Sequence, residues 1–373
     1  MLQLPGGEIA RAELLEYVGD MGQVAGVSRL EYTEGPERGV EVVRVRTGSG
    51  LDFDVLPGRG LDIAHASYQG IPLSWMSATG IPHAAFFEAE GLGWLRGFYG
   101  GLMVTCGLLN AGSPGPDAGH HTPYSGVATE DFQVVKLGLH GRASNTPARY
   151  VAADACWVDD EEYLLVVSGR VREATVFGEH IELERSIEAA LGQSHISVHD
   201  QITNHGHDSQ PLMVVYHCNF GWPVVAPTSR LVLSAERSEP RDPTAAPGLP
   251  QCRRFEPPQA SYPEQVFYHT MLADDDGAAH AALINDALRG GFGVGLTYDA
   301  SALDQFTQWK CMKRGTYVCG LEPGNCRVQG RAAEREAGRL KHLEPGESVE
   351  YELLFEILDG PEACADFVEI TRR

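Results

Sequence analysis

Residues 212–223 read LMVVYHCNFGWP and set the expectation for the rest of the chain. The run begins with five apolar residues without polar alternation, which is typical of a strand covered on both faces, and Gly221 and Pro223 then end the ladder. His217 is therefore expected near a strand end, where a rigid backbone can present an imidazole to a substrate. The alternative is a hydrogen-bonded structural histidine. Alternation sends the side chain of Cys218 to the opposite face, where it is expected to pack.

The composition favours many short strands joined by turns. The chain has 373 residues with 43 glycines and 22 prolines, and it shows no long amphipathic helical repeat. Its length allows two domains or one large β domain. We predict a mainly β protein, with an N-terminal helical extension over 1–20 and a single domain over 21–373.

Charge and targeting patterns narrow the class of partner. The chain has 29 Lys and Arg against 51 Asp and Glu, a net charge of −22, which repels nucleic acid and anionic membranes. Its start resembles no signal peptide and no apolar run reaches membrane-spanning length. We expect a cytoplasmic protein with a small-molecule partner and no nucleic acid or membrane partner. The sequence leaves open whether the chain forms a homo-oligomer. The eight cysteines form no C-x-x-C pair and are expected to be reduced.

Local periodicity predicts the elements. Helix formers over 8–18 precede Gly19, and a short helix broken by glycines is expected within 84–98. Residues 236–264 hold seven prolines and predict a long loop within one domain. Strands with period-2 or continuous apolar patterns are expected at 24–32, 40–47, 51–56, 100–105, 163–172, 181–189, 195–203, 292–298, 303–309 and 349–357.

Glu322 is the second candidate for chemistry. It closes an apolar strand, and Pro323 holds it in an extended conformation. Partial desolvation there would raise the proton affinity of the carboxylate towards working pH. The alternative is an ordinary strand-end glutamate in solvent.

Residues 140–147, HGRASNTP, concentrate polar groups beside a glycine. The guanidinium of Arg142 and the amide of Asn145 suit vicinal hydroxyls or a carbonyl, and His140 adds an imidazole. The alternative is a turn in which Arg142 pairs with a surface acid.

Three further sets of residues are weaker candidates. Arg59 and Asp62 follow the Pro57–Gly58 turn and either face a ligand or pair with one another. Trp75 and Trp94 either line a sugar cleft or pack in the core. His120 and His121, in an irregular loop over 110–126, are adjacent and point in opposite directions in an extended chain, which makes a poor metal pair.

Two of these stretches resemble a known family. His217-x-Asn219-Phe220 and Leu321-Glu322-Pro323 resemble the acid and base motifs of the aldose 1-epimerase (galactose mutarotase-like) superfamily. Gly141-Arg142-x-x-Asn145 is similar to its Gly-Arg-x-x-Asn sugar-binding motif, although His140-Gly141 equally resembles a separate His-Gly element. The stretch 57–62, PGRGLD, looks closest to a divergent, largely uncharacterised subgroup. The resemblance spans roughly 24–357.

The resemblance implies a fold and a mechanism. The fold would be a β-supersandwich of two large, mostly antiparallel sheets with a sugar cleft on a concave face. Glu322 would be the base and His217 the acid of anomer interconversion, converging at opposite sides of a pyranose. No metal or organic cofactor is expected. The substrate-binding residues would be His140, Arg142, Asn145, Arg59, Asp62, Asn219 and Lys310.

Three functions remain open from the sequence. The first is an aldose 1-epimerase (mutarotase). The second is an isomerase or lyase acting on an oxidised or ketose sugar in the same cleft, suggested by Arg59, Asp62 and Lys310. The third is a carbohydrate-binding protein without catalysis.

Overall fold

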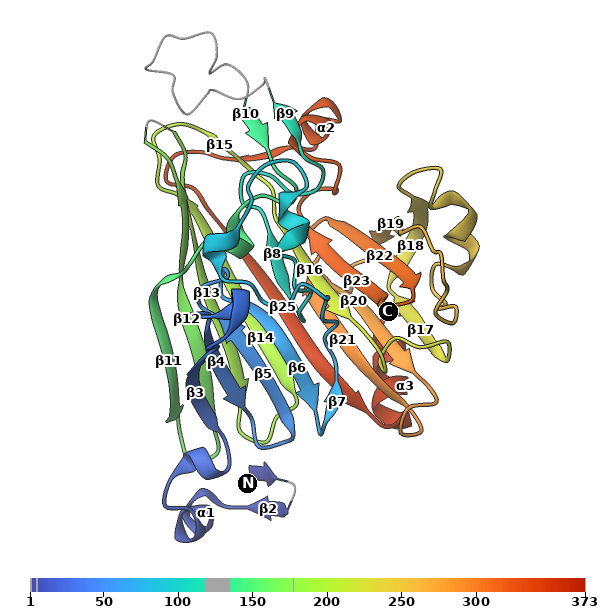
Figure 1. Cartoon of the computed structure of the whole chain (residues 1–373). Helices are drawn as coiled ribbons and strands as arrows, with labels where there is room; N and C mark the ends of the chain where they lie inside the picture. The colour runs from blue at the N-terminus through green and yellow to red at the C-terminus, as the bar shows by residue number, and fades with distance from the viewer. Residues whose placement is uncertain (1, 5, 118–134, 177, 373) are drawn as a thin grey trace.

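A computed structural model describes residues 2–4, 6–117, 135–176 and 178–372. Its largest sheet has eight antiparallel strands and crosses the molecule from β11 at one edge, through β25, to β17 at the other (Figure 1). In spatial order the strands are β11 (Arg149–Trp157), β12 (Tyr163–Ala174), β13 (His180–Ala190), β14 (His195–Asn204), β25 (Ser348–Asp359), β21 (Phe292–Asp299), β20 (Ala278–Asn285) and β17 (Ser229–Leu233).

Two further antiparallel sheets complete the sandwich. The six-stranded sheet contains β18 (Ala235–Pro240), β19 (Gln265–Met271), β22 (Gln305–Lys313), β23 (Thr316–Gly324), β16 (Val215–Phe220) and β8 (Val104–Cys106). The five-stranded sheet contains β3 (Gly26–Glu31), β4 (Glu41–Arg46), β5 (Leu51–Leu56), β6 (Asp62–Tyr68) and β7 (Ile71–Pro72).

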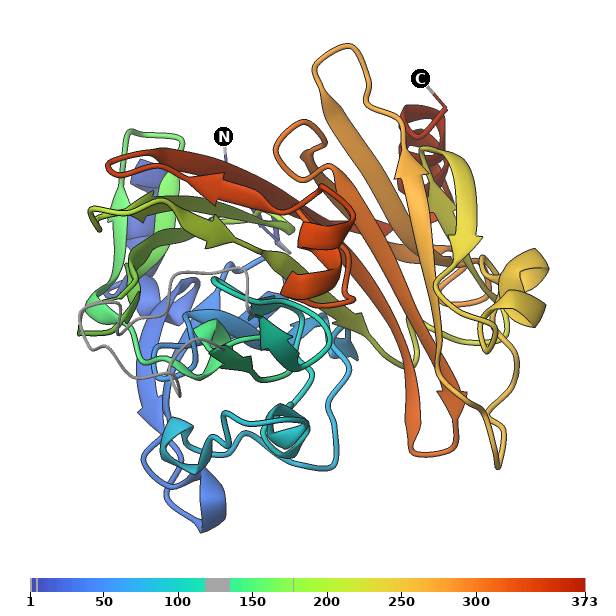
Figure 2. The same ribbon diagram turned by 90° about the horizontal axis from the view of Figure 1, so that it is seen from above.

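The smaller elements sit around these sheets (Figure 2). Two-stranded ladders pair β1 (Leu2–Leu4) with β2 (Gly7–Ile9), β9 (Gly115–Asp117) with β10 (Val135–Leu137), and β15 (Gln210–Leu212) with β24 (Lys341–Leu343). The helices are α1 (Arg11–Tyr17), α2 (Arg331–Glu336) and α3 (Pro361–Ile370), with 3₁₀ turns at Met21–Gln23, Gly35–Glu37, Ala84–Phe86, Gly93–Arg96, Ala143–Asn145 and Ala246–Gln251. Among the helices of the described residues, none combines the length and apolar composition needed to cross a bilayer.

One core joins the three sheets. Along β12, buried and less buried residues alternate, so that Leu165, Val167 and Val171 face inward as the period-2 pattern predicts. They share a hydrophobic cluster with Phe53 of β5 and Phe220 of β16. The expected class, a mainly β sandwich of antiparallel sheets, is confirmed.

Several expected boundaries differ from the structure. The strand 51–56 matches β5, but the apolar run at 212–220 is broken between β15 and β16. Residues 84–98 form two 3₁₀ turns, not a helix. The Pro-rich segment begins inside β18 and contains the turn Ala246–Gln251. Helix α3 was not predicted; it packs Cys364 and Phe367 against β20.

Candidate active site

A cavity of about 1000 Å³ opens beside the six-stranded sheet. Its wall brings together His140, His217 and Glu322 of the nine predicted site residues. A second cavity, of about 750 Å³, lies on the eight-stranded sheet and is lined by none of the nine. The first cavity is therefore the candidate active site.

His217 and Glu322 lie side by side because β16 and β23 pair antiparallel, with Cys218 opposite Leu321. The distance from His217 Nε2 to Glu322 Oε1 is 3.3 Å, and the two side chains are 7% and 2% exposed. The sequence-based expectation of two groups on opposite sides of a pyranose was wrong in this respect. As predicted, Cys218 points to the other face and joins the main core.

Burial governs the charge of this pair. Removal from water raises the pKa of Glu322 to about 8, with a further contribution from the negative charge of Glu264. The same desolvation lowers the pKa of His217 to about 4. Both effects favour the neutral forms, so the pair holds one proton near neutral pH and that proton lies on Glu322 in the free site. Among the described residues, His217 Nδ1 has no hydrogen-bond partner, and Glu322 Oε1 makes no hydrogen bond beyond its 3.3 Å contact with His217 Nε2.

Gly320 lets the two groups meet. It lies opposite Asn219 on β16 and opposite Trp309 on β22. A Cβ at this position would lie 2.8 Å from Glu322 Oε1 and 3.3 Å from His217 Cε1. Only a residue without a side chain leaves both groups where they are.

His140 faces the same cavity from a tight turn. Its φ of 55° is in the left-handed region, and its Nδ1 accepts a hydrogen bond of 3.3 Å from Gly112 N. Burial lowers the pKa of His140 to about 3, so the ring is neutral. A neutral imidazole whose Nδ1 accepts carries its proton on Nε2, which makes His140 a fixed hydrogen-bond donor.

Aromatic rings surround the His217–Glu322 pair. Phe98 and Trp309 lie 5.1 Å and 5.4 Å from the His217 ring, measured between centroids. Trp75 packs edge-on against Trp309, and Trp94 stacks on Phe98. Trp75 and Trp94, for which the sequence allowed a place in the cleft or in the core, line the cavity and also pack in one hydrophobic cluster.

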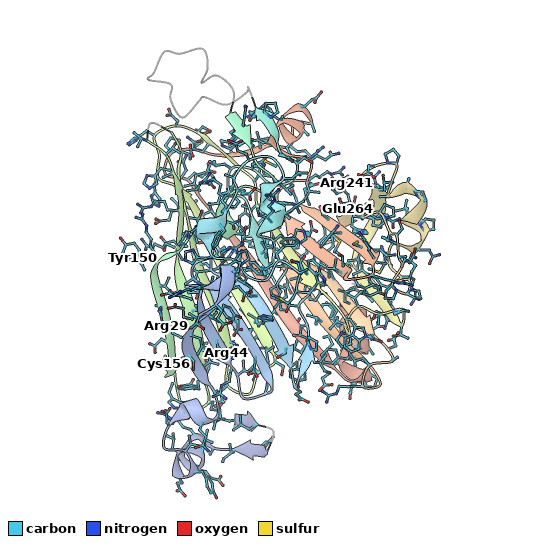
Figure 3. The ribbon with its side chains drawn as sticks, viewed as in Figure 1. Arg29, Arg44, Tyr150, Cys156, Arg241 and Glu264 are labelled. Carbon is cyan, nitrogen blue, oxygen red and sulfur yellow. The ribbon has the colours of Figure 1, made fainter. Side chains whose placement is uncertain are left out.

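The Pro-rich segment supplies a charged wall that sequence reasoning missed. Arg241, Asp242 and Glu264 line the cavity, and Figure 3 shows Arg241 and Glu264 beside the six-stranded sheet. Arg241 Nε donates to Asp242 at 2.8 Å, and Glu264 accepts from Trp309 Nε1 at 3.0 Å. The loop has no periodicity, so the sequence carries no signal that these charges face a cleft.

Arg59 is a structural residue and not a ligand-binding one. It is 2% exposed and donates to the carbonyl oxygens of Ser144, Pro82 and Gly97 at 2.7–2.9 Å. Its guanidinium also lies over the ring of Tyr99. All three bonds tie together segments distant in sequence, which corrects the expected role in recognition.

Asp62 belongs to a buried charge network between the sheets. It accepts hydrogen bonds from the backbone and hydroxyl of Thr105 and forms an ion pair of 3.0 Å with Arg185. Arg185 pairs in turn with Asp200 at 2.6 Å. Asp62 therefore pairs with Arg185 and not with Arg59, and it does not line the cavity. Neither of the two sequence-based alternatives is correct for this residue.

Lys310 is placed away from the cavity by strand alternation, since its neighbour Trp309 points in. Its amine pairs with Glu256 at 2.8 Å and donates to the carbonyls of Gln251 and Arg254. Lys310 thus anchors the Pro-rich segment. The predicted substrate contact is wrong.

Three other predicted contacts also lie off the cavity wall. Asn219 is fully buried and donates to the carbonyls of His217 and Gly101. Asn145 is buried and donates to Ser144 Oγ. Arg142 is exposed, with its guanidinium over Phe87. Of the 140–147 stretch, only His140 reaches the cavity.

No group of three or more His, Cys, Asp and Glu side chains is arranged to hold a metal ion in the described ranges. His120 and His121 lie outside the described residues.

The model of a family described as "Domain of unknown function (DUF4432)" matches residues 37–357. The chain belongs to this family. No curated protein matches it. A crystal structure of a proposed aldose 1-epimerase from Klebsiella pneumoniae is 26% identical, with a TM-score of 0.84 over 98% of this chain and 90% of that one.

More distant structures share the fold. A galactose mutarotase-like protein from Clostridium acetobutylicum has 14% identity and a TM-score of 0.60, over 90% of this chain and 99% of that one. Galactose 1-epimerase from Lactobacillus acidophilus has 11% identity and a TM-score of 0.57, with the same shares covered. The galactose mutarotase-like sandwich expected from the motifs is confirmed.

Proposed function

We propose that this protein is an aldose 1-epimerase that interconverts the anomers of a sugar by general acid–base catalysis. The observation that carries the proposal is the contact of His217 with Glu322, both buried on the wall of a cavity, with His217 Nδ1 lacking a hydrogen-bond partner among the described residues. Buried unpartnered polar atoms are costly, and they are typical of sites that bind a polar ligand.

The reaction needs one base and one acid close together. The hydroxyl oxygen and the ring oxygen that exchange protons sit on the same carbon, so two groups 3.3 Å apart suit both from one side. One group removes the proton of the anomeric hydroxyl while the other protonates the ring oxygen, and the C1–O5 bond breaks. After the carbonyl end rotates, the reverse transfers close the ring and restore the proton to its first owner.

The number of protons that the His217–Glu322 pair carries near neutral pH fits this cycle. The resemblance assigns Glu322 as base and His217 as acid. With the proton on Glu322 in the free site, the opening step begins instead with His217 as base and Glu322 as acid, and the roles exchange on closing. Either starting form carries a single proton, which is what the cycle requires.

His140 supports the open-chain intermediate in this proposal. Its Nε2–H is a neutral donor fixed by Gly112, suited to a carbonyl oxygen that forms when the ring opens. Trp75 and Trp309 offer apolar faces for the C–H faces of a sugar ring. Arg241 and Asp242 offer donors and acceptors for its hydroxyls.

The experiment is NMR exchange spectroscopy of a panel of aldoses with the purified protein, using His217→Ala and Glu322→Gln as controls. Acceleration by the parent protein and a loss of about 10²- to 10⁴-fold in each variant are expected. Variants that exchange anomers as fast as the parent protein would rule out the assigned pair.

The hypothesis of a reaction on an oxidised or ketose sugar rested on Arg59, Asp62 and Lys310. Because these residues do not line the cavity, the hypothesis loses its support. A binding protein without catalysis is the remaining alternative. It differs by giving sugar binding that survives Glu322→Gln, together with no anomer exchange on any sugar.

A further inference from the structure

The indole of Trp309 lies directly against the catalytic pair. Its ring meets that of His217 at 76° with centroids 5.4 Å apart. Trp309 also pairs in register with Gly320, whose missing Cβ would lie 3.2 Å from Trp309 Cβ as well as against Glu322 and His217. A displacement of this indole would therefore change the packing that holds the His217 imidazole.

Glu264 holds the indole in place. One carboxylate oxygen accepts from Trp309 Nε1 at 3.0 Å, and the other lies 3.5 Å from Arg241 Nη2. Arg241 is fixed in turn by Asp242 at 2.8 Å. Arg241 and Glu264, near the two ends of the Pro-rich segment, thus meet beside Trp309. Both carboxylate oxygens of Glu264 have a partner.

The exposure of Glu264 argues against a role in overall stability. Its side chain is 54% exposed, and ion pairs at such positions contribute little to folding free energy. Glu264 instead lines the same cavity as His217 and Glu322.

Building on the proposed function, we propose that Glu264 is a positioning residue of the active site. Through its hydrogen bond to Trp309 it fixes the indole, and the indole fixes the ring of His217 beside Glu322. Arg241 holds the carboxylate in the orientation that this requires.

The same residues act on Glu322 through charge. Besides burial, the negative charge of Glu264 raises the pKa of Glu322, and the positive charge of Arg241 lowers it. Loss of the Glu264 charge should lower this pKa. The other titratable groups around Glu322 are His217 on β16, Cys106 on β8, Tyr268 on β19, and Cys218 and Cys319.

The test compares Glu264→Ala with Glu264→Gln, which keeps an oxygen that can accept from the indole. Glu236→Gln, on an exposed residue of β18, is the matched control for charge. The chain has five tryptophans, so ¹H–¹⁵N spectra should show five indole signals, and Trp309→Phe assigns the relevant one. This signal should shift in Glu264→Ala, where the acceptor of the indole N–H is lost, and should stay near its parent position in Glu264→Gln.

Anomer exchange of glucose, galactose and other aldoses supplies the functional readout. We expect kcat to fall about 10- to 100-fold in Glu264→Ala and Trp309→Phe, and no further in the double variant. Glu264→Gln should stay within about threefold of the parent, with the alkaline limb of its pH profile at lower pH. Glu236→Gln should change neither kcat nor the limb.

Two results would overturn the positioning role. One is a Trp309 indole signal that is unchanged in Glu264→Ala. The other is a double variant in which the kcat losses of Glu264→Ala and Trp309→Phe multiply. If the parent protein accelerates no sugar, the proposed function fails. The ¹H–¹³C signal of the His217 ring then still decides the positioning role, since it must shift in Glu264→Ala and recover in Glu264→Gln.

Discussion

Replacing Glu322 by glutamine should make the protein more stable at alkaline pH while removing its activity. Burial raises the pKa of Glu322 from its usual 4.5 to about 8. Because the folded-state pKa lies above the unfolded one, the stability that this group contributes is fully present below pH 4.5 and is lost as the pH rises through about 8. The gap corresponds to about 5 kcal/mol. Glutamine has a similar shape and no charge to bury.

Thermal unfolding of parent and variant at pH 5 and pH 9 measures this effect. The gain in stability on going to glutamine should be larger at pH 9, by up to about 5 kcal/mol, which is about 6 °C in Tm for a chain of this length. Burial also raises the pKa of Glu173, to about 7, but that group is present in both proteins and cancels in the comparison. Anomer exchange should fall about 10²- to 10⁴-fold in the same variant.

The reasoning is refuted if the Tm difference between parent and variant is equal at the two pH values. The folded protein would then ionise Glu322 as easily as the unfolded chain does. A variant less stable at pH 9 than the parent would mean that the carboxylate, and not the acid, is the form the site stabilises.

Three further outcomes are expected. The pH profile of kcat/KM should be flat between about 4 and about 8, the pKa values of His217 and Glu322, and should fall on both sides as the pair gains or loses its single proton. Gly320→Ala should push the Glu322 carboxylate away from His217 and lower kcat about 10- to 100-fold, with a circular dichroism spectrum like that of the parent. Lys310→Met should lower the unfolding free energy by about 2–4 kcal/mol in urea, because Glu256 and two carbonyls lose their partner, with KM unchanged; a raised KM would restore Lys310 to the binding site.

The strand pattern of the fold was readable from the sequence wherever one face of a strand is buried. A strand is predicted over 163–172, and β12 covers Tyr163–Ala174 with buried and less buried residues in alternation. Where both faces are covered the period disappears, so the break between β15 and β16 within one apolar run could not be seen. Helix α3 lacks any motif and forms because Phe367 covers β20.

Part of the site was readable for a similar reason. His217 and Glu322 each follow an apolar run, and two covered strands of one sheet can bring such residues together. Which strands become neighbours is a matter of topology. That is why the sequence placed the pair across a sugar and the structure places it in direct contact at 3.3 Å.

All the misassigned residues except the exposed Arg142 share one physical feature: each is a charged or polar group that the fold buries. Arg59, Asp62 and Lys310 stand among apolar neighbours in sequence, as a ligand-binding residue in a cleft would. A buried charge must find compensation, but the compensating group is a partner distant in sequence, such as Arg185 for Asp62 or Glu256 for Lys310.

Compensation separates Arg59 and Lys310 from the His217–Glu322 pair. Each guanidinium nitrogen of Arg59 donates to a carbonyl, and the Lys310 amine has an acid and two carbonyls as partners. His217 and Glu322 are buried as deeply, yet His217 Nδ1 has no hydrogen-bond partner among the described residues, and Glu322 Oε1 contacts only His217, at 3.3 Å. A fold selected for stability alone would remove that cost, so its persistence at the wall of a cavity supports a catalytic role for the pair, and its removal in Glu322→Gln should show as added stability.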